Sequence, residues 1–443
     1  MWNKGGVPLP FQPRKANVRD SFARISHRLR LNPDFTKLWV SDTISVFGSQ
    51  ITLLALPLTA ALLLHASPPQ MGLLVAMGTL PFGLFSLHAG AIIDRRRKLP
   101  LIKLVTWSRG GLLLVVPLAA YVDLLRMEIL YAVAFLLASH AVFADVGYQT
   151  LIARLVAREE LVEANSRFGL SESSATIAGP SLAGLLVQWL TAPFAIVLDA
   201  LLFLVSGCVL GSMKLREPPP GERPAGITLW HEIREGLRAV RAHPVLRWTG
   251  TLLAAWQFLY HMLVAVFVLF AVREVGLSAG TVGLIFSTAG LGFFAGSLYV
   301  KQVSRRIGLG PTMLSGMYAT ALGWGIISLA GGGTQAAAAL VLALLCQGFG
   351  AGLFFLTHIS LRQGVTPERL LARVISTMRF IAVAATPLGA LLGGALGEAI
   401  GLRATVALVA VGGIALATVA MLYSPLKPLK EMPEPGMPLQ QER

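Results

Sequence analysis

Residues 72–102 read GLLVAMGTLPFGLFSLHAGAIIDRRRKLPLI. No Lys, Arg, Asp or Glu occurs between residues 72 and 93, and one acidic and four basic residues follow this apolar run. A helix needs about 20 apolar residues to cross the hydrocarbon core of a bilayer. The stretch therefore predicts one membrane span, a short charged loop and the start of a second span.

The rest of the chain has the same character. Of its 443 residues, 55% are hydrophobic and only 13% are charged, and the mean hydropathy is +0.68. Soluble domains carry about 25% charged residues, so the composition excludes a water-soluble globular protein and a disordered chain. The apolar runs are also too long for the alternating strands of about ten residues in a membrane β-barrel. The sequence predicts an all-α membrane protein.

The spacing of the apolar runs predicts twelve spans with both termini in the cytoplasm. In that orientation the cytoplasmic segments hold 32 of the 37 Lys and Arg residues, as the positive-inside rule requires. The net charge of +15 then reflects topology and contact with anionic lipids, and we expect no nucleic-acid partner. The expected spans are roughly 38–64, 70–93, 101–121, 128–153, 162–189, 193–213, 245–271, 279–300, 311–330, 335–361, 370–397 and 404–424.

Polar segments divide the chain into five regions. The stretch REPPPGERPAG (216–226) cannot lie inside a helix because of its prolines, and TLWHEIREGLRAVRAHP after it predicts an amphipathic helix. The regions are a basic cytoplasmic N-terminal tail (1–37), an N-terminal six-helix half (38–214), a cytoplasmic linker with the amphipathic helix (215–244), a C-terminal six-helix half (245–424) and a disordered cytoplasmic tail (425–443).

Two segments, 207–208 residues apart, are alike. EELVEANSRFGLSESSATIAGPSLAGLL begins at Glu159, and PERLLARVISTMRFIAVAATPLGALLGG begins at Pro367. Each has a charged start, an ionisable residue in mid-span (Glu172 and Arg379) and a proline among small residues. Each forms the fifth span of its half. The sequence therefore predicts two related six-span halves, which is the layout of major facilitator transporters.

Over about residues 33 to 424 the chain resembles the major facilitator superfamily. Within it, the chain is most similar to the exporter branch that includes enterobactin exporters and macrolide efflux proteins. The stretches that carry the resemblance are LWVSDTISVFGSQITLLALPL (38–58) and residues 72–102. The resemblance implies twelve transmembrane helices in two pseudo-symmetric six-helix halves (the major facilitator fold), and transport without ATP.

The loop after residue 93 resembles the superfamily's signature for the loop between spans two and three. A loop carboxylate can accept from N–H groups at a neighbouring helix N-terminus, where the helix dipole favours negative charge. Such contacts would close the cytoplasmic face in one state and release it in another; the alternative is a topology signal alone. Arg97 stands where a second glycine is usual, and the second-half equivalent has lost its acidic residue. The matching residues are Gly90, Asp94, Arg95 and Lys98.

The fifth span resembles a loosened form of the superfamily's antiporter signature. Small residues at these spacings let two helices approach closely, and an internal proline allows a bend. The resemblance favours antiport, and the alternative is ordinary close packing of helices. The matching residues are Ser166, Ala175, Gly179, Pro180 and Gly184.

Polar and aromatic residues recur on one face of spans one, four, seven and ten. These spans resemble the four helices that form the walls of the central cavity in the superfamily. Charged residues also lie inside spans three, four, five and eleven, where an unpaired charge costs roughly 3 kcal/mol or more. For three candidates there is an alternative to a role in transport: a static ion pair for Arg109 with Asp145, a packing role for Tyr260, and a position at the membrane interface for Asp42. Asp199 is interpreted as structural. The cavity and coupling candidates are Asp42, Arg109, Asp145, Gln149, Glu172, Gln257, Tyr260, His261, Gln347 and Arg379.

The sequence gives no sign of catalytic chemistry. It contains no phosphate-binding Gly-Lys loop for ATP, no zinc-protease motif and no nucleophile elbow. Cys208 and Cys346 lie singly in apolar runs, as small core residues do, rather than in a disulfide or zinc pattern. We expect no enzyme activity, no metal and no cofactor.

Together these features predict a monomeric secondary transporter of the bacterial plasma (inner) membrane. It would export a small organic molecule, drug-like or siderophore-like, by alternating access with proton antiport, in contact with membrane lipids. The alternative is a non-transporting receptor or a lipid scramblase on the same scaffold. Proton-driven transport in loaded vesicles separates the two.

Overall fold

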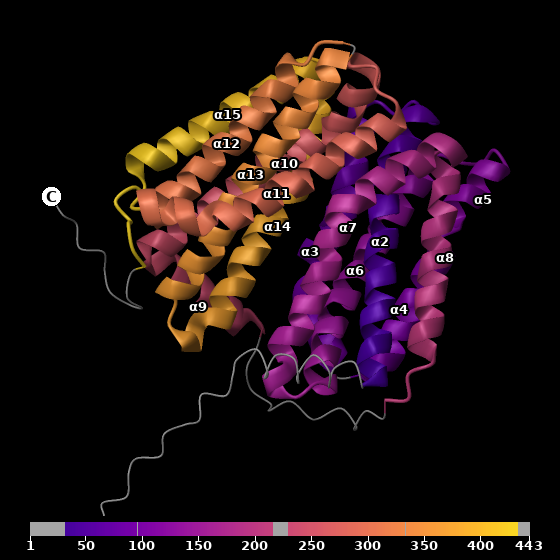
Figure 1. The fold of residues 1–443 in the computed structure, drawn as a ribbon, viewed down its shortest axis with the longest axis horizontal. Helices are drawn as coiled ribbons and strands as arrows, with labels where there is room; N and C mark the ends of the chain where they lie inside the picture. Colours follow the sequence, from indigo (N-terminus) through magenta and orange to yellow (C-terminus); the bar gives the residue numbers. More distant parts are fainter. Residues whose placement is uncertain (1–31, 95, 216–228, 333, 433–443) are drawn as a thin grey trace, which may run out of the picture.

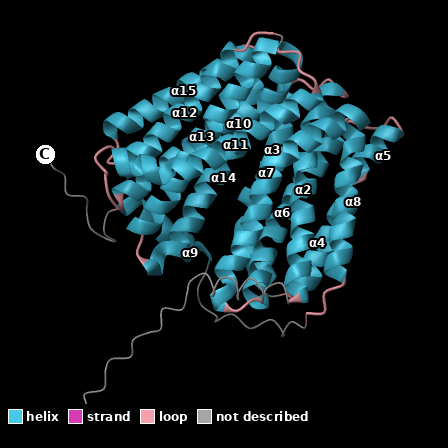
Figure 2. Ribbon diagram, viewed as in Figure 1, coloured by secondary structure: helices cyan, strands magenta, loops and turns pink. Residues whose placement is uncertain are grey.

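The computed structural model describes residues 32–94, 96–215, 229–332 and 334–432, and within these ranges the chain is helical and has no strand (Figure 2). Nine of the helical segments in this part of the chain are long and apolar enough to cross a membrane. The helices are α2 (Pro33–Leu62), α3 (Pro68–Asp94), α4 (Lys98–Leu113), α5 (Val115–Tyr121), α6 (Met127–Leu155), η1 (Arg158–Glu160), α7 (Leu161–Leu190), α8 (Ala192–Gly211), α9 (Leu229–Ala242), α10 (Pro244–Leu269), η2 (Phe270–Glu274), α11 (Ala279–Ile307), α12 (Leu309–Leu329), α13 (Thr334–Val365), α14 (Glu368–Ala399) and α15 (Leu402–Tyr423).

Most helix boundaries lie close to the expected spans, and local chemistry explains where they fall. Asn32 caps α2 by accepting from the backbone N–H of Phe35 (3.0 Å), which satisfies a donor that the first helical turn leaves unpaired. The expected span at 101–121 is broken into α4 and α5 at Leu114. Pro117 explains the break, because it cannot donate to the carbonyl of Leu113 and its ring crowds that carbonyl.

The helices form two bundles (Figure 1). We call α2–α8 the N-terminal bundle and α9–α15 the C-terminal bundle. The bundles diverge toward the end of the molecule that holds the start of α2, the end of α8 and helix α9, here called the open end. They converge at the opposite end, here called the closed end, where α3 and α11 begin and α7 and α14 finish.

Glycines let the two bundles touch at the closed end. A Cβ on Gly283 of α11 would lie 2.3 Å from the carbonyl oxygen of Pro180 in α7, and a Cβ on Gly72 of α3 would lie 2.6 Å from that of Ala390 in α14. Between α7 and α11 the hydroxyls of Ser181 and Ser287 are also hydrogen-bonded (2.6 Å). We call these two contacts the α7/α11 seam and the α3/α14 seam.

Helix α9 is the amphipathic helix expected in the linker, and it lies on the C-terminal bundle at the open end (Figure 1). Glu235 forms an ion pair with Arg373 of α14. Gly236 packs so closely on α14 that an added Cβ would meet the carbonyl of Arg373 at 2.8 Å. The linker's proline-rich break at 216–226 lies outside the described residues.

Candidate functional site

A cavity of about 490 Å³ lies within the N-terminal bundle and contains three of the predicted carboxylates. Asp42 comes from α2, Asp145 from α6 and Glu172 from α7. The three groups are close enough to repel one another electrostatically. We call this cavity the acidic chamber, and its side chains include the predicted Gln149 together with Tyr148 and Asn165, which the sequence analysis did not single out.

Asp145 joins the two bundles. Its Oδ2 accepts from Arg379 Nη2 of α14 (3.0 Å), and its Oδ1 accepts from Gln149 Nε2 one turn along α6 (2.9 Å). The side chains of Arg379 and Asp145 are 55% and 40% exposed. The carboxylates of Asp42 and Glu172 have no hydrogen bond or ion pair within the described part of the chain.

Arg109 contacts residues other than Asp145, the partner that the sequence analysis gave as an alternative. Its Nη2 donates to Ser49 Oγ of α2 (3.0 Å), and its guanidinium lies over the ring of Phe203 of α8 at 4.3 Å. Side-chain direction on α4 explains the outcome, because α4 packs against α8 and Arg109 points into the bundle rather than toward Asp145. The Arg109–Asp145 pair is therefore absent from this state.

Arg109 interacts electrostatically with the carboxylate of Asp199, from α8. Asp199 is fully buried, and Oδ2 of its carboxylate accepts from the hydroxyl of Thr52. A Cβ on Gly48 would lie 2.3 Å from its other oxygen, so the glycine makes room for the carboxylate. The structural interpretation of Asp199 fits this position in the interior of the N-terminal bundle.

A second cavity, of about 430 Å³, adjoins the acidic chamber. Its walls are mostly apolar, with Leu53, Leu56 and Leu74 among them, and we call it the apolar chamber. The predicted residues Tyr260 and His261 of α10 line it from the C-terminal bundle. The two chambers share the lining residues Ser49, Phe82, Arg109 and Ala141.

Other candidates of the C-terminal bundle belong to its packed interior. Trp256 is 2% exposed and stacks on Trp324 with ring centroids 4.6 Å apart. Trp324 Nε1 donates to Gln347 Oε1 (3.2 Å), and Gln347 is 9% exposed, so its predicted place on a cavity wall is not seen in this state. Gln257 is half-buried, and its backbone carbonyl is 2.8 Å from His261 Nδ1.

The span-five motif packs α7 on both sides. Ala175 and Gly179 are buried, and a Cβ on Gly179 would lie 2.4 Å from Gln50 of α2, whereas Pro180 and Gly184 face α11. Glu172, which lies three residues before Ala175 in the same helix, is exposed and lines the acidic chamber. The four motif residues Ala175, Gly179, Pro180 and Gly184 therefore lie at close contacts of α7 with its neighbours α2 and α11.

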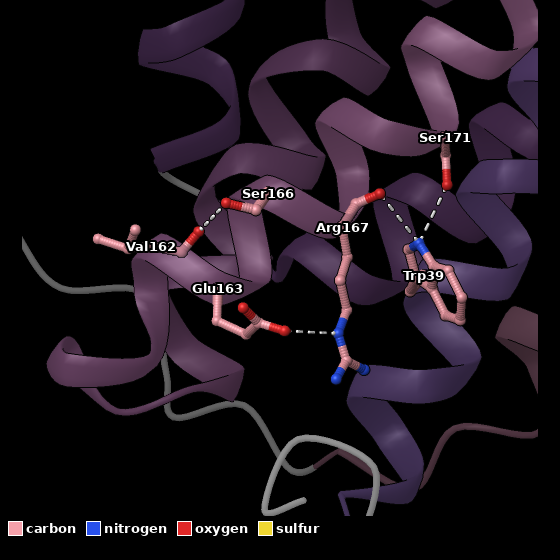
Figure 3. A network of polar contacts seen from close by, with 6 residues as sticks. All are labelled: Trp39, Val162, Glu163, Ser166, Arg167 and Ser171. Atoms are coloured by element: carbon pink, nitrogen blue, oxygen red, sulfur yellow. Dashed lines mark hydrogen bonds and ion pairs between the residues drawn. The ribbon is translucent and has the colours of Figure 1, made fainter. Parts of the chain in front are cut away.

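A polar network connects the first part of α7 to α2 (Figure 3). Trp39 Nε1 donates to Ser171 Oγ (3.0 Å) and to the carbonyl of Arg167 (3.3 Å), and Arg167 Nε pairs with Glu163 (3.4 Å). Ser166, the first motif residue, donates to the carbonyl of Val162 in its own helix (2.8 Å). These contacts fix the wall that carries Asp42 and Glu172. Sequence reasoning missed them because a serine in a helix carries no distinguishing signal.

The gate motif falls largely outside the described side chains. Helix α3 ends at Asp94, and α4 begins at Lys98, which is 3% exposed. Arg95 and the side chains at positions 90 and 94 lie outside the described part of the structure. The gating role of this loop stays a prediction.

The fold and the chambers define a helical membrane protein with an internal polar site in the N-terminal bundle, which Arg379 of the C-terminal bundle reaches. The family described as Transmembrane secretion effector (MFS_3), whose members are transporters of the major facilitator superfamily, matches residues 28–441. The chain belongs to this family, and the superfamily predicted from residues 38–58 and 72–102 is confirmed.

Two relatives have exporter names. The chain is 28% identical over 399 residues to the multidrug efflux pump Tap of Mycolicibacterium fortuitum, covering 86% of this chain and 93% of Tap. It is 26% identical over 405 residues to the enterobactin exporter EntS of Citrobacter koseri, covering 89% and 92%. A solved bacterial homologue of the human lysosomal transporter Spinster, inward-facing and occupied, shares the fold with a TM-score of 0.66, 15% identity and coverage of 88% and 95%.

Proposed function

We propose that this chain is a secondary active transporter that exports a small organic molecule, drug-like or siderophore-like, by alternating access. The proposal rests on one observation, that the two bundles are apart at one end of the molecule and in contact at the other. They diverge at the open end beside the acidic chamber and are held together at the closed end by backbone contacts at Gly72 and Gly283 (Figure 1). An alternating-access cycle needs a seal of this kind on one side and its release on the other.

The proposal includes twelve spans in two related halves, with the region boundaries given above. Helices α7 and α14 begin at Leu161 and Glu368 and contain Pro180 and Pro387, and each pair is 207 residues apart. Of the expected spans, those in α3, α7 and α12 are not among the nine helices of the described residues that are long and apolar enough to cross a membrane; α7 and α12 are rich in Gly, Ser and Thr, which lowers their hydropathy. The distribution of Lys and Arg supports a bacterial plasma membrane location with the open end and both termini in the cytoplasm.

Proton antiport is the proposed energy source. Asp145 and Glu172 lie in a water-accessible chamber at membrane depth, where a carboxylate can exchange a proton with the open side and lose it on the other. The chamber also contains Asp42, so protonation of one group lowers its repulsion with the other two. Purified protein in vesicles with an imposed pH gradient tests the proposal.

The experiment begins with a thermal-shift screen of the purified protein against siderophores, macrolides and dyes. A stabilising compound is then loaded into vesicles, and its flux is followed with and without the gradient. Uphill movement that stops when the gradient collapses is expected. Equal flux of the compound in protein-free vesicles and in protein-containing vesicles would overturn the proposal and leave a receptor or scramblase role.

A further inference from the structure

We propose that Arg379 is a tethered counter-cation that a cationic group of the substrate displaces from the acidic chamber, so that the two chambers together take an amphiphilic organic cation. The inference rests on the proposed function and names the substrate class and a specificity-determining residue for it. It is carried by the cross-bundle ion pair of Arg379 with Asp145, which places a guanidinium of the C-terminal bundle on one of the three carboxylates of the acidic chamber.

The charges around the chamber do not balance. Asp42, Asp145 and Glu172 supply three carboxylates, and of the cations that reach them within the described part of the chain, only Arg379 contacts one. Arg109 also lines the chamber, but it donates to Ser49, lies over Phe203 and faces the buried Asp199.

The imbalance matters when the chamber closes. In the present state Glu172 is exposed, and Asp42 and Asp145 are half-buried, so water reaches the three carboxylates. Closure removes that water, and a carboxylate without a partner is then costly at membrane depth. A bound cation offsets the cost, which makes a loaded chamber easier to close than an empty one.

Arg379 demonstrates that the site accepts an organic cation. Its guanidinium Nη2 lies 3.0 Å from Asp145 Oδ2 while more than half of the side chain remains exposed. A partly exposed ion pair contributes little stability because water competes for both partners. A substrate cation entering from the open end can therefore exchange with Arg379, and the exchange separates α14 from α6 at mid-membrane.

The apolar chamber supplies the second half of the recognition. It meets the acidic chamber at Ser49, Phe82, Arg109 and Ala141, and its volume of about 430 Å³ fits an apolar group of drug size. A molecule with a positive charge and an aromatic or aliphatic body fills both chambers at once. An anion of the same shape would meet three carboxylates instead.

The experiment compares two probes of the same shape and opposite charge, tetraphenylphosphonium and tetraphenylborate. Binding to the purified full-length protein is measured by equilibrium dialysis for wild type, Arg379→Gln, Arg379→Lys and Glu172→Gln. The matched control is Arg373→Gln, which removes a guanidinium from the same helix α14 where it pairs with Glu235 outside the chambers.

We expect Arg379→Gln to bind the cation at least about fivefold more tightly, the low end of coupling between linked sites. Arg379→Lys and Arg373→Gln should stay near wild type, and Glu172→Gln should bind the cation more weakly. Unchanged or weaker cation binding by Arg379→Gln, or an equal gain for tetraphenylborate, would overturn the inference.

Measuring flux in vesicles distinguishes a failure of this inference from a failure of the proposed function. Gradient-driven export that persists while cation binding ignores Arg379 would end this inference and leave the proposed function standing. Cation binding that follows Arg379 in a protein that exports nothing would uphold the site and overturn the proposed function.

Discussion

Replacing Gly72 by Ala should push the protein out of the state seen here. The added Cβ would lie 2.6 Å from the carbonyl oxygen of Ala390 and 3.0 Å from Gly394 Cα, and both are backbone atoms that cannot rotate away. Overpacking of this kind costs about 1–3 kcal/mol. Because the cost applies only while the α3/α14 seam is closed, the ratio of parted to closed molecules should rise about 5- to 150-fold.

The control for this change is Gly83→Ala on the same helix. A Cβ at Gly83 meets nothing within 4 Å, so this variant carries only the general gain of alanine over glycine in a helix, about 1 kcal/mol. The two variants therefore differ in the seam contact and not in helix propensity.

The assay is a spin-label distance measurement across the closed end. Labels at Leu124 and Gly332, exposed loop positions of the two bundles, are introduced after Cys208 and Cys346 are replaced. Gly72→Ala should add a population at longer distance, whereas Gly83→Ala should superimpose on the parent protein. Identical distance distributions for both variants, with equal melting temperatures, would refute the reasoning about the seam.

Three further predictions address the charges. Asp94→Asn should leave folding intact and reduce transport, because the loop motif implies that this carboxylate holds helix ends together; normal export by the folded variant would remove the gating role. Neutralising the coupling carboxylate, by Asp145→Asn or Glu172→Gln, should abolish uphill export while counterflow at equal pH persists; uphill export by both variants would place the proton site elsewhere. Arg109→Gln should destabilise the protein by about 1–3 kcal/mol because it removes the positive charge that stabilises the buried Asp199 carboxylate, and the double change with Asp199→Asn should recover most of the lost melting temperature. A single variant as stable as wild type would show that Asp199 does not depend on Arg109.

The sequence predicted the membrane class, the family and the amphipathic linker helix, because each depends on composition or local pattern. Apolar runs of span length determine which segments cross the membrane, and the proline-rich break followed by a polar–apolar alternation determines where α9 lies. The interruption of the helix at Leu114 was not predicted, because Pro117 lies in an apolar run in which hydropathy alone shows no interruption.

The pairing of charges was harder to predict than their presence. Arg109, Asp145, Glu172 and Arg379 were all recognised as intramembrane charges, but a span pattern does not say toward which neighbour a side chain points. Helix α4 packs on α8, so Arg109 turns toward Asp199, and Asp145 is left for Arg379 of the other bundle. Rotation of a helix by one position changes such a partner without changing the hydropathy of the span.

Glu172 and Arg379 occupy corresponding positions in α7 and α14, but they carry opposite charges. Glu172 and Arg379 are 207 residues apart, like Pro180 and Pro387, yet one adds negative charge to the acidic chamber and the other neutralises it. The proposed relation between the halves predicts the shared helix and the shared proline, and at one position the two helices carry charges of opposite sign. The contact between the bundles at mid-membrane is then electrostatic, whereas at the closed end it is steric, through Gly72 and Gly283. An electrostatic contact responds to protons and ions, but a steric one does not. For the proposed transport cycle we therefore expect protons or substrate to act first at the Asp145–Arg379 pair, before the glycine contacts of the closed end separate.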